Sequence, residues 1–166
     1  MESARRFLDG LHRVECLVAV AAFSFIALIL LADTLGRELF SQGVFGAQRY
    51  AVFALVIGAY MGLGIATATG SHLRPRFADS WLPAAWGPAV DRVADLVTGL
   101  FLTGVAAAAA MFVLQSIEVE ERTMVLDWLV WPFQLAIPLG FLSAAIRYFF
   151  FAAYPVLRPK PAEGQE

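Results

Sequence analysis

The chain has 166 residues, of which 60% are hydrophobic and 16% are charged. This composition excludes an ordinary soluble domain, whose surface would need far more charge, and indicates an integral membrane protein. The net charge of −2 argues against a nucleic-acid partner, and the single cysteine, Cys16, excludes an intrachain disulfide and a cysteine-based metal cluster.

The first predicted span covers residues 14–36. Its apolar core, from Cys16 to Ala32, is longer than the hydrophobic segment of a typical signal peptide, and no clear small-residue cleavage site follows it. We therefore interpret it as a retained membrane helix. Residues 5–14 are predicted to form an amphipathic, interfacial lead-in. The short connection over residues 39–47 contains two glycines, which predicts an antiparallel hairpin with the next span.

The second predicted span covers residues 49–70. Residues 50–69 carry no charge, and a helix of this length measures about 30 Å, the thickness of the hydrocarbon core of a bilayer. Small residues recur at every fourth position and predict a smooth helix face: Gly58, Gly62, Ala66 and Gly70. Such a face serves either packing inside this chain or docking of another subunit, and both interpretations stay open.

Residues 77–86 are predicted to form a short amphipathic helix in the headgroup layer. Trp81 and Trp86 suit this position because an indole ring can be half hydrated and half buried there. The third span, residues 90–117, contains an alanine tract from Ala106 to Ala110, which predicts a second close-packing face. An acidic loop follows over residues 118–127.

The fourth predicted span covers residues 128–150. Pro138 is expected to kink it, and Arg147 is expected to end it by extending its guanidinium to the interface. Residues 156–166 have little apolar content and predict a flexible cytoplasmic tail. The predicted fold is an all-α integral membrane protein, with a single domain of four transmembrane helices over residues 1–155.

Arginine and lysine are distributed unequally between the two sides of this four-span arrangement. Nine lie at the termini or between the second and third spans, and three lie on the opposite side. The positive-inside rule therefore predicts that both termini are cytoplasmic. The acidic loop then faces outward, towards the periplasm if the source is a Gram-negative bacterium.

Few residues offer chemistry at membrane depth. A transport site needs ionisable or convergent polar groups there, and the predicted spans contain almost none. Asp95 is expected to pair with Arg92 near the interface instead of binding an ion. His12 and His72 lie too close to the boundary to hold haem between helices. No nucleophile, phosphate-loop or zinc signature occurs, so we expect neither a cofactor nor an enzyme.

Several motifs occur in an order that resembles a known family. Arg37 follows the first span, Gly58-Ala59-Tyr60-Met61-Gly62 lies in the second, and the spans continue with Gly70-Ser71-His72-Leu73-Arg74, Leu82-Pro83 and Ile137-Pro138-Leu139-Gly140, ending near Arg147. The set resembles the small membrane subunit of tripartite ATP-independent periplasmic (TRAP) transporters, the DctQ-like proteins. Relatives often carry acidic residues where this chain has Gln48-Arg49 and Pro75-Arg76, so the ion pairs of those acids are not carried over.

The resemblance implies a multi-pass subunit of the bacterial inner membrane that has no transport pathway of its own. A separate large membrane subunit would hold the substrate and sodium sites, and a periplasmic binding protein would deliver an organic acid or similar solute. The small subunit, surrounded by lipid, would be a fixed scaffold. The predicted family-motif residues of this chain are His72, Arg74, Pro138 and Gly140.

Two sets of contact residues follow as hypotheses. The predicted large-subunit interface consists of Gly58, Gly62, Ala66, Trp81 and Trp86. The predicted contact with the binding protein consists of Arg37, Glu38, Glu120, Glu121 and Arg122. Two alternatives from other classes are a stand-alone small homo-oligomeric transporter, which would need a membrane-embedded charge, and a membrane anchor subunit of a respiratory complex.

Overall fold

The computed structural model describes residues 2–70, 87–123 and 127–158. Four long helices dominate this part of the chain: α1 (Glu2–Phe40), α2 (Ala47–Ala68), α3 (Gly87–Glu118) and α5 (Ala136–Ala153). A single helical turn, α4 (Trp131–Gln134), precedes α5, and a short 3-10 turn, η3 (Pro155–Leu157), follows it. Four helical segments, with α4 and α5 taken as one, are long and apolar enough to cross a membrane.

The helices agree with the predicted spans in order and approximate position. The largest difference is α1, which has 39 residues because the predicted lead-in over residues 5–14 continues into the span without a break. At 1.5 Å per residue, α1 is about 58 Å long and exceeds the hydrocarbon core of a bilayer. The predicted interfacial helix over residues 77–86 lies outside the described residues.

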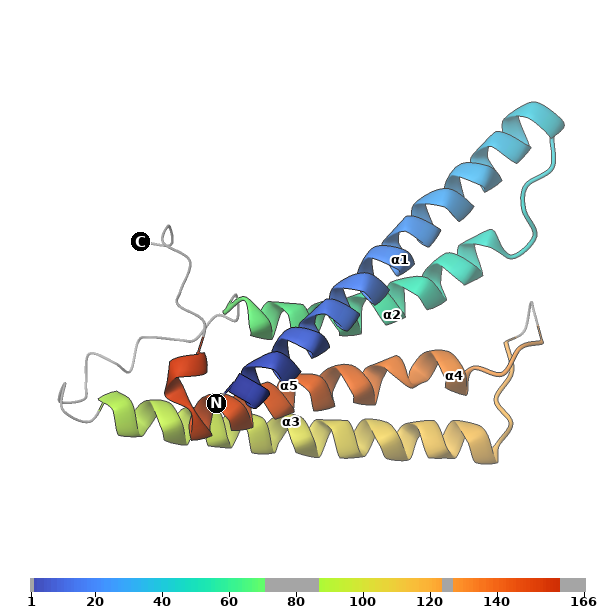
Figure 1. Cartoon of the computed structure of the whole chain (residues 1–166). Coiled ribbons are helices and arrows are strands. Elements are labelled where there is room, and N and C mark those ends of the chain that lie inside the picture. The colour runs from blue at the N-terminus through green and yellow to red at the C-terminus, as the bar shows by residue number, and fades with distance from the viewer. Residues whose placement is uncertain (1, 71–86, 124–126, 159–166) are drawn as a thin grey trace.

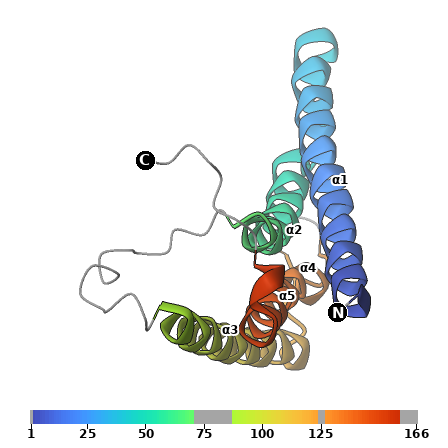
Figure 2. The same cartoon turned by 60° about the vertical axis from the view of Figure 1, so that its left-hand side comes forward.

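The helices form two antiparallel hairpins that pack on each other. Figure 1 shows α1 beside α2, and α3 beside α4 and α5, with the chain direction reversed within each pair. Contact between the hairpins is made chiefly by α2 and α5. Figure 2, which views the molecule from another side, places α1 and α3 at the outside and α2 and α5 between them. The central helices are therefore also the most buried.

Small side chains allow the helices to approach closely. Ala144 and Ala145 of α5 are 0% and 1% exposed, and buried alanines also line α1 and α2 at Ala22 and Ala54. Lipid tails are as apolar as these side chains, so close van der Waals packing, rather than the hydrophobic effect, holds such helices together. Stacked rings of Phe53 and Phe133, 4.3 Å between centroids, add contact between α2 and α4.

The fourth membrane segment is interrupted at Leu135, between α4 and α5. The proline responsible is Pro138, because its ring nitrogen has no hydrogen to donate to the carbonyl of Gln134 and the ring crowds that carbonyl. The amide of Leu139 resumes helical bonding to the carbonyl of Leu135, at 3.3 Å. The interruption thus lies one turn before Pro138, where the missing hydrogen bond would have been accepted, and the kink at Pro138 stays a prediction.

Candidate functional site

A buried ion pair joins the first membrane helix to the last. Arg147 of α5 donates to both carboxylate oxygens of Glu15 of α1, over 2.9 Å to Oε1 and 2.7 Å to Oε2. The side chains are only 1% and 3% exposed. Two expectations are wrong: that the predicted spans contain almost no buried ionisable group, and that the Arg147 guanidinium extends to the interface. Arg147 turns inward because a carboxylate on another helix pairs with both arms of its guanidinium.

Ser143 and Gly64 complete the surroundings of this pair. The Ser143 hydroxyl donates to Glu15 and accepts a hydrogen bond from Nη1 of Arg147, 2.9 Å away. On the α2 side, a Cβ added to Gly64 would lie 2.6 Å from the carboxyl carbon of Glu15. The absence of a side chain at residue 64 therefore provides the space for the carboxylate.

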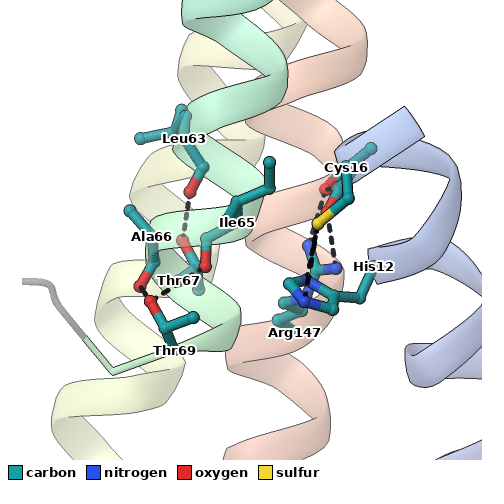
Figure 3. Close-up of polar contacts among 10 residues, drawn as sticks. His12, Cys16, Leu63, Ile65, Ala66, Thr67, Thr69 and Arg147 are labelled. Carbon is teal, nitrogen blue, oxygen red and sulfur yellow. Dashed lines mark hydrogen bonds and ion pairs between the residues drawn. The ribbon is translucent and has the colours of Figure 1, made fainter. Parts of the chain in front are cut away.

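Figure 3 shows the other groups at this end of the molecule. Arg147 extends from α5 towards α1, which carries His12 and Cys16, while Thr67 and Thr69 lie on the ribbon of α2. The Cys16 sulfur is 3.6 Å from Nε2 of His12. In residues 2–70, 87–123 and 127–158, no cluster of three or more histidine, cysteine or acidic side chains could hold a metal ion.

A signal for the Glu15–Arg147 pair was present in the sequence. Glu15 immediately precedes the apolar core of the first span, and Arg147 closes the last span. In a chain with four spans, the start of the first and the end of the last lie on the same side of the membrane. Opposite charges at those two positions can therefore meet, although the pattern within either helix alone does not reveal the pair.

A second ionic cluster holds the C-terminal end of the described chain against α3. Arg158, just after η3, donates to Asp91 at 2.7 Å and also to Asp95. The expected partner of Asp95 was Arg92, so that prediction is wrong. Burial would by itself lower the pKa of the Arg158 guanidinium. The hydrogen bonds and negative charges of Asp95 and Asp91 outweigh burial and raise the pKa above its ordinary value, so Arg158 keeps its charge.

The opposite end of α1 carries two of the residues predicted to contact the binding protein. Arg37 pairs with the buried Asp33 at 2.8 Å, and the same aspartate accepts the backbone N–H of Val44 at 2.8 Å. Asp33 thus ties the connecting loop to the end of α1. Arg37 and Glu38 are both exposed at this end.

The other three predicted binding-protein contacts lie in the loop after α3. Glu121 accepts a hydrogen bond from the buried Ser116 hydroxyl at 2.9 Å, so its carboxylate is directed back towards the helix. Arg122 pairs with Asp127 at 3.4 Å and lies 4.0 Å from Glu120. This loop and the end of α1 lie at the same end of the molecule (Figure 1), but contact with a partner stays a prediction.

The residues predicted to dock the large subunit have different surroundings in the structure. Gly58 faces α1, where an added Cβ would lie 3.2 Å from the ring of Phe23. Gly62 has open space at that position, and Ala66 is half-buried. Trp81 and Trp86 lie outside the described residues. Internal packing therefore involves Gly58, and docking at Gly62 and Ala66 remains a prediction.

Of the four family-motif residues, the structure describes two. Pro138 lies in the first turn of α5. Gly140 lies where α5 touches α2, since an added Cβ would be 2.9 Å from Cβ of Tyr60. His72 and Arg74 are not among the residues that the structure describes.

An apolar groove of about 470 Å³ opens between α1, α2 and α4. Its walls are aliphatic and aromatic and include Phe25, Tyr50, Phe53 and Trp128. These side chains suit the hydrocarbon of a bilayer and offer little to a charged solute.

Comparison with protein families identifies the chain's relatives. The family model described as "Tripartite ATP-independent periplasmic transporters, DctQ component" matches residues 26–156, which is most of the chain. Among curated proteins, none matches the chain. The family match agrees with the resemblance found in the motifs.

Proposed function

The chain belongs to the DctQ component family of the tripartite ATP-independent periplasmic transporters, and we propose that it is the scaffold beside the large membrane subunit of such a transporter. In this proposal the large subunit binds sodium and the solute, an organic acid or similar compound, which a periplasmic binding protein delivers. The chain crosses the bacterial inner membrane four times, with both termini in the cytoplasm. Its outward end, including Glu38, faces the binding protein.

The observation that supports a scaffold best is the pairing of the buried acids. Among the described residues, the buried carboxylates are Glu15, Asp33 and Asp95. Each one pairs with an arginine of the same chain, respectively Arg147, Arg37 and Arg158. A carboxylate that served as an ion or proton site would have to be available to its ligand. Pairs satisfied within the chain instead fix helices and loops.

Reconstitution in liposomes tests this function directly. We expect sodium-driven uptake of an organic acid only when this chain, the large subunit and the binding protein are all present, and no uptake when sodium is replaced by choline. Liposomes that contain this chain alone should take up nothing. Uptake by this chain alone would contradict the proposal and would support the stand-alone transporter.

A further inference from the structure

The Glu15–Arg147 pair lies where the two hairpins meet at the N-terminal end of α1. Along most of its length α1 packs on α2, not on α5. Near its N-terminus it also reaches α5, through the ion pair and through the rings of Phe7 and Phe150, whose centroids are 6.1 Å apart. These two contacts join helices from different hairpins.

Apolar contacts alone define the position of a membrane helix weakly. One aliphatic face resembles another, and lipid competes equally well for it. A bidentate carboxylate–guanidinium pair differs, because two parallel hydrogen bonds form in only one relative orientation. Shifting either helix would leave a charge buried without its partner, which is far more costly than exchanging one methyl contact for another.

The surroundings are shaped for this pair. Gly64 leaves space for the carboxylate on the α2 side, and Ser143, one turn before Arg147 on α5, bonds to both partners. Groups from α1, α2 and α5 therefore converge on a single pair that is almost completely buried. If the Glu15 carboxylate were buried only to avoid lipid, it would not need the space that Gly64 leaves for it on α2.

We propose that Glu15 and Arg147 form an interhelical lock that fixes α1, and with it the first hairpin, against the second hairpin. This inference goes beyond the proposed function, because it concerns the conformation of this chain and holds whether or not the chain braces a large subunit. The lock acts through position rather than through net stability, since a buried ion pair contributes little to stability by itself.

Cysteine cross-linking in membranes tests the lock. Phe7→Cys and Phe150→Cys, in a Cys16→Ala background, place one thiol on α1 and one on α5 at the positions that carry the two contacting rings, and a short bifunctional thiol reagent bridges the space that the rings leave. We expect efficient cross-linking in the parent and a fall of about tenfold in Glu15→Gln, in Arg147→Met and in the double variant, because all three lose the orienting pair. Arg37→Gln is the matched control on α1 and should cross-link like the parent, because its partner Asp33 lies on the same helix.

The double variant decides between a lock and a pair without a positional role. It leaves no buried charge unpaired, so it should accumulate in the membrane even where the single variants do not. Cross-linking of Glu15→Gln/Arg147→Met at the parent's rate would overturn the proposal. If that variant does not accumulate, Arg147→Lys decides, because it keeps the charge and loses the bidentate fork. Parent-level cross-linking in Arg147→Lys would then overturn the lock.

Discussion

At the scale of single residues, several glycines act through the side chain that they lack. Gly64 makes space for the Glu15 carboxylate, and Gly140 lets α5 approach the backbone of Tyr60. Gly104 of α3 has no heavy atom within 4 Å of the place where a Cβ would stand. Glycines within helices thus differ in whether a neighbouring helix occupies the space where a side chain would stand.

Gly140→Ala is therefore expected to destabilise the protein. The added methyl group would lie 2.9 Å from Cβ of Tyr60 and 3.0 Å from its carbonyl carbon, so α2 and α5 must separate. We expect a loss of about 1–3 kcal/mol in the free energy of unfolding, as for other overpacked cores. Titration with a denaturing detergent, followed by helical circular dichroism, measures this loss.

Gly104→Ala is the matched control. Its methyl group meets no neighbour, and alanine is the better helix former by about 1 kcal/mol, so the free energy of unfolding should stay constant or rise. Equal losses in both variants would show that the close approach of α5 to Tyr60 does not determine the cost.

At the scale of elements, Pro138 separates α4 from α5. Pro138→Ala restores an N–H that can donate to the carbonyl of Gln134 and removes the ring that crowds it. We expect α4 and α5 to join and the amides of residues 135–140 to exchange hydrogen more slowly. Hydrogen–deuterium exchange with mass spectrometry measures this in detergent micelles. Unchanged exchange over this segment would mean that another contact causes the interruption at Leu135.

The sequence predicts the elements well because membrane thickness dictates their length. An uncharged run such as residues 50–69 can hardly be anything but a spanning helix. No comparable rule predicts which residues far apart in the chain form ion pairs. Glu15 and Arg147 are 132 positions apart, and Arg158 is 63 positions from Asp95, so periodicity within one helix could not reveal either pair.

The spacing of the small residues likewise predicts a smooth face but not its neighbour. Gly58 and Gly62 lie one turn apart on α2, yet only Gly58 meets α1. The spacing is equal, but beyond Gly58 the next close contact with α1 is at Gly64, which lies two residues after Gly62 and therefore on nearly the opposite side of α2. The choice between internal packing and subunit docking therefore depends on the position of a second helix, which no local pattern contains.

At the scale of the whole molecule, the position of Gly62 allows a clean test of subunit docking. Gly62→Ile adds bulk where the chain has open space, so its own fold should persist while a large subunit that docks there is released. Co-purification of the large subunit with this chain measures the effect, and we expect at least tenfold less in the variant because close helix contacts need small residues.

Gly104→Ile provides the control, since Gly104 is equally open but lies on α3. It should retain the large subunit. The reverse result, with release by Gly104→Ile and retention by Gly62→Ile, would move the docking face from α2 to α3. Gly58→Ile is unsuitable for this purpose because it would collide with Phe23 inside the chain.

The length of α1 has a consequence for depth in the bilayer. Its uncharged part, from Cys16 to Ala32, measures about 26 Å, slightly less than the hydrocarbon thickness. Ionic side chains follow at once on both flanks, at Glu15 and at Asp33. If α1 slid along its axis by one turn, about 5.4 Å, the ionic side chain at one flank or the other would enter the hydrocarbon core. The helix is consequently held at one depth in the bilayer. A protein that binds either protruding end would therefore lie at a constant distance from the membrane surface.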